Sequence, residues 1–354
     1  MNTKIVVFPY NAFAYPIVNY LLKCGYSVYP LSLSGTGLIN KDVSLSINSQ
    51  TIGVNVYDYS TFTFSSDMDV YLVNSPIESP MHEKSIEFLE MIANLNNIRI
   101  FKNSMLILEE YPSIKNIHNF TQNYDYLKHN ERNFYNVNIP VVFVSGIIDT
   151  IDNSVISLSL IKELRCKGMN AQLISNDCNS EFAFTYLFPR EFMNNGLSIE
   201  SRISILNDFI RFICETNKPD ILLMQIPKGL LRYDDSFYNS FGAYTFMISE
   251  AVTCDYFICS FPYELCNIAY FDLINDYVNR KLNTNISSIH MSSISLRHDI
   301  TQTKTGEPQL MYNLRYDFNE LNYHNSEDYL IGDFHNSEFV KKISNQITKI
   351  WKGD

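Results

Sequence analysis

The sequence lacks the features that mark several large protein classes. It contains no run of 18 uninterrupted apolar residues, so no membrane-spanning helix and no membrane partner is predicted. Residues 1–4 lead directly into the apolar stretch Ile5–Phe8 without the parts of a secretory leader, which predicts a cytoplasmic protein. The 27 lysine and arginine residues are scattered among 38 acidic residues, and the net charge is −11. A nucleic-acid partner is therefore not expected.

Cysteine and histidine patterns are equally sparse. The seven cysteines include no C-x-x-C pair, and two of the three closest in sequence, Cys254, Cys259 and Cys266, fall in or beside an apolar strand pattern. The seven histidines show no H-x-x-x-H spacing, and no G-x-S-x-G motif is present. These absences predict no disulfide framework, no metal site and no hydrolase nucleophile.

What the sequence does contain predicts a two-domain α/β protein. Its 354 residues are 46% hydrophobic and 18% charged, as in globular proteins, and short apolar runs alternate with helical patterns. We predict a Rossmann-like parallel-sheet domain over residues 1–110, a linker over 111–138 without strands, and a degenerate P-loop-like α/β domain with a C-terminal helix over 139–354.

Both predicted domains open with a strand, a loop and a helix. In the second, Val141–Val144 is expected to be a central strand, with a helix over 154–166 packed on the sheet. In the first, a strand over 4–8 is followed by a helix that ends at Cys24 and Gly25.

The loop after Val144 stands where a P-loop would. Gly146 and Ser154 have suitable spacing, but Ile151, Asp152 and Asn153 replace the second glycine and the lysine. Asp149 and Asp152 would repel a polyphosphate, so no cofactor is expected and a nucleotide is disfavoured. Either Asp152 or Ser154 is simply a helix N-cap, or the loop holds a polar ligand through Gly146, Asp149, Thr150, Asp152, Asn153 and Ser154.

A second candidate loop set follows Met224. It comprises Gln225, Lys228, Gly229, Asn239, Gly242 and Tyr244, and a plain connector is its alternative interpretation. Since the strands before the two loop sets are expected to be neighbours, the loops should form a cleft, with the first domain closing over it. Gln225, Asn239 and Tyr244 would supply neutral hydrogen bonds there, suited to peptide amides or a small polar ligand. Gln225 and Asn239 are expected to be exposed. Gly35, Thr36 and Gly37 form a secondary candidate, for which a hairpin is the ordinary explanation.

Several motifs in order along the chain resemble one protein family. They are Phe8-Pro9-Tyr10, Gly35–Leu38, Gly168 before Gln172–Ser175, Phe188-Pro189 with Phe192-Met193, Lys218–Asp220, Ile226–Gly229, Phe241-Gly242, and Ser249–Val252 with Asp255. The chain thereby resembles the peptide maturation system proteins associated with clostridial Cys-rich peptide and radical-SAM natural-product clusters. Members tend to have Lys in place of Asn153 and Gly in place of Lys228. The second domain also resembles a dethiobiotin-synthetase-type P-loop domain.

The resemblance implies an accessory role in ribosomal peptide (RiPP) natural-product maturation, with a precursor peptide or a maturation enzyme as partner. An alternative is an ATP- or GTP-dependent ligase or transferase that acts on the peptide through a remodelled P-loop. A third interpretation, a self-assembling protein or homo-oligomer, draws on the 24 Tyr and 24 Phe residues. Whether the chain is an enzyme stays open at this point.

Overall fold

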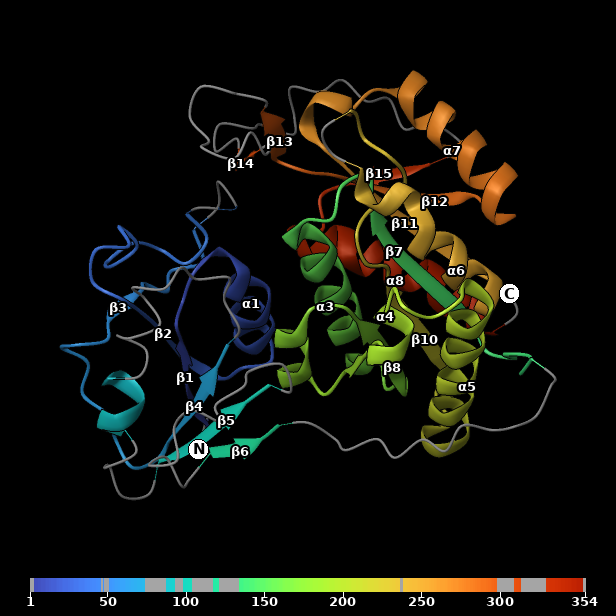
Figure 1. The fold of residues 1–354 in the computed structure, drawn as a ribbon. Coiled ribbons are helices and arrows are strands. Elements are labelled where there is room, and N and C mark those ends of the chain that lie inside the picture. Colours follow the sequence, from blue (N-terminus) through green and yellow to red (C-terminus); the bar gives the residue numbers. More distant parts are fainter. Residues whose placement is uncertain are drawn as a thin grey trace. The chain divides into compact units, whose positions relative to one another are not determined.

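The chain forms two compact α/β units. The structure, a computed structural model, describes residues 3–45, 47, 51–73, 87–92, 98–103, 117–120, 134–235, 238–297, 309–312 and 329–352. Unit 1 comprises residues 1–123 with Asp177–Phe184, and unit 2 comprises residues 124–176 with 185–354. All strand pairs within the two main sheets are parallel, which confirms the predicted two-domain α/β fold (Figure 1).

Unit 1 has the strand order of a Rossmann fold. Its sheet runs β3-β2-β1-β4-β5-β6, an order that reverses direction between β1 and β4. The strands are β1 (Lys4–Phe8), β2 (Ser27–Ser32), β3 (Tyr57–Asp58), β4 (Met68–Leu72), β5 (Arg99–Lys102) and β6 (Ile117–Asn119). Helix α1 (Tyr15–Lys23) follows β1 as predicted, and Gly25 beyond its end has a φ of 86°. The described residues 87–92 form a second helical segment.

Two local predictions for unit 1 are wrong. Strand β6 pairs in parallel with β5, although its residues fall in the segment that we expected to contain no strand. Its three residues include a histidine and an asparagine, so hydrophobic pattern alone misses it. The turn at Gly35–Gly37 is no hairpin, because β2 and β3, which flank it in sequence, pair in parallel.

A short segment from the second half of the sequence also belongs to unit 1. It is the 3-10 helix η2 (Cys178–Ala183), which lies between strands of unit 2 in the sequence. Phe182 stacks on Tyr71 with ring centroids 4.6 Å apart, and the Asn103 amide donates to Asn179 Oδ1 at 3.1 Å. Contacts over long sequence separations therefore decide which unit this segment joins.

Unit 2 is built on a seven-stranded sheet with β7 in the middle. The order is β15-β12-β11-β7-β10-β8-β9, which confirms the predicted central strand. The strands are β7 (Val141–Gly146), β8 (Ala171–Ser175), β9 (Tyr186–Leu187), β10 (Ile221–Gln225), β11 (Tyr256–Phe261), β12 (Ile286–Met291) and β15 (Leu330–Gly332). A separate antiparallel pair joins β13 (Ile294–Arg297) and β14 (Gln309–Tyr312).

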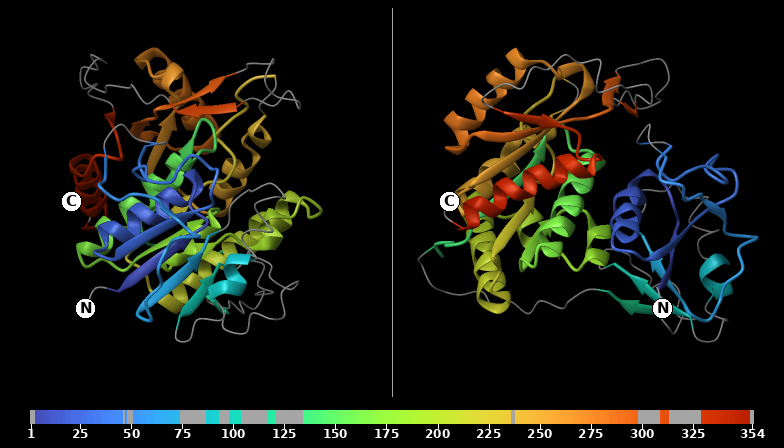
Figure 2. Two further views of the ribbon diagram at one scale, coloured as in Figure 1. Left: turned by 90° about the vertical axis from the view of Figure 1, so that its left-hand side faces the viewer. Right: turned by 180° about the vertical axis from the view of Figure 1, so that it is seen from behind.

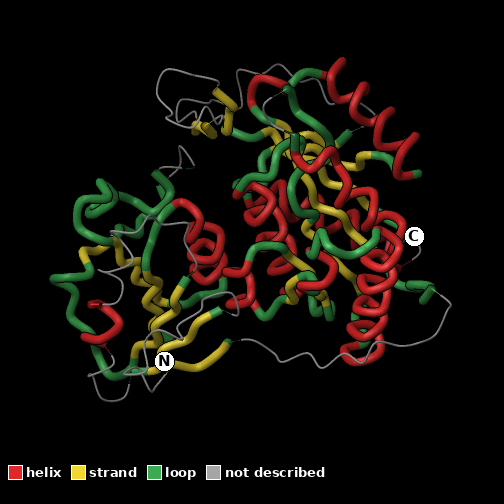
Figure 3. Tube along the Cα trace, in the orientation of Figure 1, coloured by secondary structure: helices red, strands yellow, loops and turns green. Residues whose placement is uncertain are grey.

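Helices cover both faces of this sheet. Helices α3 (Ile151–Cys166) and α8 (Ser337–Lys352) lie side by side, as the right-hand view of Figure 2 shows. The other face carries α5 (Ile199–Asn217), α6 (Ala243–Ala251) and α7 (Ile268–Leu282), preceded by the short α4 (Arg190–Met193). Figure 3 shows strands flanked by helices within each unit. No helix of the described residues is long and apolar enough to cross a membrane.

Candidate functional site

The first turn of α3 lies at the carboxyl edge of the sheet in unit 2, where parallel α/β folds place their ligands. The helix begins at Ile151, three residues before the predicted start, and its N-cap is Thr150, whose hydroxyl accepts from the Asp152 N–H at 3.3 Å. Neither Asp152 nor Ser154 is the cap. Both are buried residues inside the helix, so their side chains are available for tertiary contacts.

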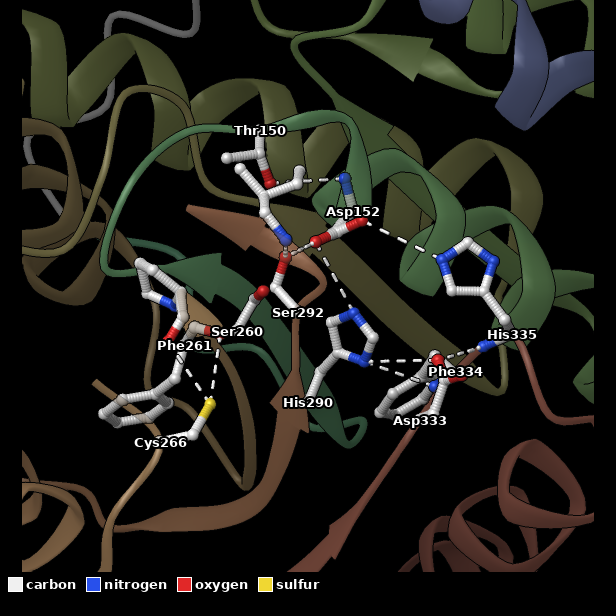
Figure 4. Close-up of polar contacts among 12 residues, drawn as sticks. Thr150, Asp152, Ser260, Phe261, Cys266, His290, Ser292, Asp333, Phe334 and His335 are labelled. Atoms are coloured by element: carbon white, nitrogen blue, oxygen red, sulfur yellow. Dashed lines mark hydrogen bonds and ion pairs between the residues drawn. The ribbon is translucent and has the colours of Figure 1, made fainter. Parts of the chain in front are cut away.

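Asp152 lies between two histidines that are far away in the sequence (Figure 4). Its Oδ2 is 3.6 Å from His290 Nε2, and its Oδ1 is 3.9 Å from His335 Nε2. His290 is near the end of β12, and His335 follows β15. All three side chains are more than nine-tenths buried. A buried carboxylate is stable as an anion only beside a positive charge. Here that charge can come from a proton on one of the imidazoles or from a bound metal ion.

The pKa values of Asp152 and His290 are both shifted by their interaction. Burial opposes ionisation of Asp152, but the attraction of the two nearby imidazoles, His290 and His335, outweighs it, and the pKa of the carboxyl group is lowered. Burial also favours neutral His290, yet the Asp152 carboxylate prevails and raises the pKa of the imidazole. Asp152 is thus an anion at neutral pH, which is the form that binds metals.

Neighbouring groups orient the carboxylate and the His290 ring. The Ser292 hydroxyl donates to Asp152 Oδ2 and accepts from the Ile294 N–H at 2.9 Å. The Phe334 N–H donates to His290 Nδ1 at 3.2 Å, and Asp333 Oδ1 lies 3.8 Å from the same nitrogen. His290 Nε2, which faces Asp152, has no hydrogen-bond partner among the described residues. For Nε2 to bind a metal ion, the ring proton would have to move to Nδ1, which now accepts from the Phe334 N–H, and Asp333 is the nearby carboxylate that could then accept that proton.

The spacing of the three ligand atoms suits one metal ion. They lie within 4.8 Å of one another, the one such group of three His, Cys, Asp or Glu side chains among the described residues. Two ligands of a tetrahedral Zn²⁺ ion at about 2.1 Å are about 3.4 Å apart. The distances from Asp152 to His290 and His335 exceed this by only a few tenths of an ångström. These two distances use different oxygens of Asp152, and the three ligand atoms lie within 4.8 Å of one another, so the side chains would have to move toward one another by up to about 1.4 Å to coordinate one ion.

Sequence reasoning missed this cluster because it tested histidines only for short-range motif spacing. Asp152 and His290 are 138 positions apart, so no motif joins them. The sequence did contain one indication of this site, because His290 lies near the carboxyl end of an apolar strand, a position that commonly contacts ligands. The three cysteines considered above do not form a comparable cluster in the described part of the chain, and none of the seven cysteines is in a disulfide bond.

The second carboxylate of the loop, Asp149, has different partners. Its Oδ2 accepts from the Lys228 N–H at 2.9 Å and from the Asn176 amide at 3.4 Å, and its Oδ1 accepts from the Asn153 amide at 3.3 Å. Burial raises the pKa of the carboxyl group, while the Lys228 N–H and the amides oppose the rise. Asp149 therefore uses the donors that this loop would otherwise offer to an external anion.

The two predicted loop sets do lie together, but their neutral polar residues are structural. Gln225, the last residue of β10, is 1% exposed; its amide donates to Ser154 Oγ at 3.1 Å and accepts from the Ser175 hydroxyl at 2.8 Å. The Asn239 amide is also buried and donates to the carbonyls of Ile147 and Leu231. The expectation that these two side chains are exposed is wrong, because both satisfy buried polar groups.

The remaining predicted residues have diverse surroundings. A Cβ on Gly229 would lie 2.6 Å from Asn239 Cγ, and one on Gly242 would lie 2.2 Å from the Leu230 carbonyl oxygen, so both glycines permit close backbone packing. Tyr244 is buried, and the Arg202 guanidinium lies 5.0 Å from its ring centroid.

Four further predicted residues remain, one in unit 2 and three in unit 1. Gly146 ends β7, and its carbonyl accepts from the Leu230 N–H at 2.9 Å. In unit 1, Gly35 and Gly37 have φ values of 91° and 73°, and Thr36 contacts the Ser32 hydroxyl at 2.9 Å. These contacts give each position a role in holding its own turn.

Comparisons with known proteins leave the family open. No protein-family model and no curated protein matches the chain. A solved structure, a DUF1611 family protein from Anabaena variabilis, is similar with a TM-score of 0.49 and 8% sequence identity. The match covers 82% of this chain and 88% of that one. The functional argument therefore depends on the site itself.

Proposed function

We propose that unit 2 binds a single divalent transition-metal ion through Asp152, His290 and His335, and that this centre takes the place of a nucleotide site. The observation that carries the proposal is the buried cluster of three ligand atoms within 4.8 Å of one another. Two imidazoles and a carboxylate form a ligand set found with Zn²⁺ and with non-haem Fe²⁺.

Three protein ligands leave at least one coordination position for water or substrate. Such an ion would supply Lewis-acid or, for iron, redox chemistry at that position. The chain's own contribution is to keep Asp152 ionised, to orient it through Ser292, and to hold the His290 ring beside Asp333. The burial of all three ligands also limits access of bulk water.

The surroundings support metal over nucleotide. Asp149 occupies the Lys228 N–H and the nearby amides, and Asn153 stands in place of the phosphate-binding lysine. A ligase or transferase with a remodelled P-loop, the alternative suggested by the sequence, would have to displace Asp149 before phosphate could bind. That displacement is opposed by three hydrogen bonds.

The biological setting follows only from the resemblance noted in the sequence. We place the protein in ribosomal peptide maturation, as an accessory protein or metal-dependent enzyme that acts with a precursor peptide or a partner enzyme. We expect a reducing, cytoplasmic setting for this role, in which the seven cysteines would remain thiols.

The test is metal titration of the full-length protein with Zn²⁺ and Co²⁺, followed by calorimetry and by visible absorption of the Co²⁺ form. We expect one ion per chain and a loss of affinity of at least about 100-fold in His335→Ala, which lacks a ligand. Asp333→Asn should weaken binding about 10-fold, since partners behind a ligand contribute about that much. The matched control is His118→Ala, at an exposed position in β6.

Metal binding would also raise the melting temperature of the native protein, by an amount that grows with the logarithm of the ratio of metal concentration to Kd. Equal affinity in His335→Ala, His118→Ala and the unmodified chain would refute the proposal. So would a stoichiometry that does not change when His290 and His335 are both replaced by Gln.

A further inference from the structure

Unit 2 displays two stacked aromatic rings on an unusual turn. Tyr238 and Phe241 are 50% and 60% exposed, and their rings stack at 5.3 Å with an interplanar angle of 16°. The Arg232 guanidinium lies 5.5 Å from the Tyr238 ring centroid. We call Tyr238, Phe241 and Arg232 the aromatic turn. Large exposed rings grouped in this way commonly mark an interaction site.

The backbone of the turn is held in a costly conformation. Four consecutive residues, Asn239 to Gly242, have positive φ values of 46°, 51°, 56° and 68°. Glycine adopts this region freely and asparagine tolerates it, whereas serine and phenylalanine do so at a cost in conformational energy. Here that conformation points Phe241 into solvent instead of into the core.

Buried contacts enforce this arrangement from both ends. The Asn239 amide donates to two buried or partly buried carbonyls, at 2.7 and 2.8 Å. Gly242 packs against the Leu230 carbonyl with no room for a Cβ. A strained backbone that the surrounding structure maintains, and that exposes apolar rings, is typical of a functional surface.

The exposed area of the aromatic turn limits the kind of ligand that it can bind. The exposed parts of two aromatic side chains amount to about 200 Å², well below the roughly 800 Å² per partner of a standard protein interface. A second folded copy of the chain would therefore need much more surface than the turn provides. A single aromatic side chain from an extended peptide needs no more.

The segment just before the aromatic rings is acidic on balance, because Asp234, Asp235 and Glu264 lie near Tyr233 and Arg232 is the one cation among them. The Arg232 charge is paired with Asp235, whose side chain is 98% exposed, and the neighbouring Tyr233 hydroxyl donates to Glu264 at 3.1 Å. These carboxylates disfavour a nucleotide, whose phosphates are anionic, and favour cations next to the stacking group.

We infer that the aromatic turn binds a peptide segment in which an aromatic residue is flanked by basic residues, with its ring stacked on Phe241. The inference does not depend on the metal centre, because none of its residues is a ligand there. Stacking supplies the specificity for an aromatic ring, and the nearby carboxylates supply the preference for Lys or Arg beside it.

The experiment uses saturation-transfer NMR on the full-length protein with three probe peptides: acetyl-Lys-Trp-Lys-amide, acetyl-Lys-Leu-Lys-amide and acetyl-Glu-Trp-Glu-amide. Only the first should bind measurably. Phe241→Asn, which retains a residue that tolerates positive φ, should weaken that binding about fivefold, the effect expected for one aromatic contact.

Phe184→Asn is the matched control, since Phe184 is also an exposed phenylalanine, 62% accessible, with a φ of 55°. It should leave probe binding unchanged. Equal binding of acetyl-Lys-Trp-Lys-amide to Phe241→Asn and the unmodified protein would overturn the inference. AMP binding that is lost in Phe241→Asn would indicate a nucleotide instead, and a dimer that dissociates in Phe241→Asn would indicate a second copy; either result also overturns it.

Discussion

Replacing Gln225 with Ala tests whether the polar residues between the two loops hold the sheet together. Gln225 is 1% exposed and links Ser154 and Ser175, which are also buried. The substitution removes two buried hydrogen bonds at about 1 kcal/mol each, and the cavity left by the side chain adds about 1 kcal/mol. We therefore expect a loss of about 3 kcal/mol, or about 6–12 °C in the melting temperature of a unit of this size.

The chain carries a convenient reporter for this measurement. Its single tryptophan, Trp351, is in α8, so the change of tryptophan fluorescence during urea or thermal unfolding reports on unit 2. The matched control is Gln172→Ala in β8, whose amide donates to Asn170 at an exposed position. It should change stability by no more than about 0.5 kcal/mol. If both variants lost the same stability, the assigned structural role of Gln225 would be incorrect.

Two further predictions concern aspartates that accept hydrogen bonds from backbone N–H groups. Asp149→Ala should free the donors of Lys228 and Asn176 for an anion. In thermal unfolding, pyrophosphate at ten times its Kd should then stabilise the variant by about 1.4 kcal/mol and leave the unmodified protein unaffected. An identical response of both proteins would contradict the assigned contacts. In unit 1, burial opposes ionisation of Asp42, but the hydrogen bonds from Ser44 and Gly53 and their neighbours outweigh it and lower the pKa of Asp42. Because the folded pKa is below the unfolded one, Asp42 contributes stability above about pH 4 that is lost as the pH falls through the folded pKa. Asp42→Asn should remove part of the acid sensitivity of unit 1, as measured by hydrogen exchange at pH 5 and pH 3, and an unaltered acid response would count against this account.

Asp149 and Asp152 show that two similar residues of one segment can have different roles in the folded protein. Asp149 and Asp152 are three positions apart, and their charges alone predict the same effect on an approaching phosphate. The structure directs Asp149 to the backbone of the loop after β10 and Asp152 to the histidines after β12 and β15. Asp149 thus takes up hydrogen-bond donors of the loop, and Asp152 faces the two histidines of the proposed metal site.

The sequence by itself determined the fold class and much of the local structure. Apolar runs such as Val141–Val144 are buried on both faces in a parallel sheet, which is why they predict central strands. Ser198, a residue type that favours N-caps, begins α5, and its hydroxyl accepts from the Ser201 N–H. The meeting of the loops after β7 and β10 also followed, since neighbouring parallel strands end at the same edge.

Only the tertiary structure decided which side chains meet and which are buried. Strands β11, β12 and β15 are adjacent in the sheet, which brings His290 and His335 to the start of α3 over more than 130 positions of sequence. The same packing buries Gln225 and pairs its amide with two serine hydroxyls, although its polar side chain and its place at the end of a strand suggest an exposed loop residue. Local patterns depend on interactions within a few residues, whereas strand order and side-chain burial depend on contacts between distant segments that no short motif encodes.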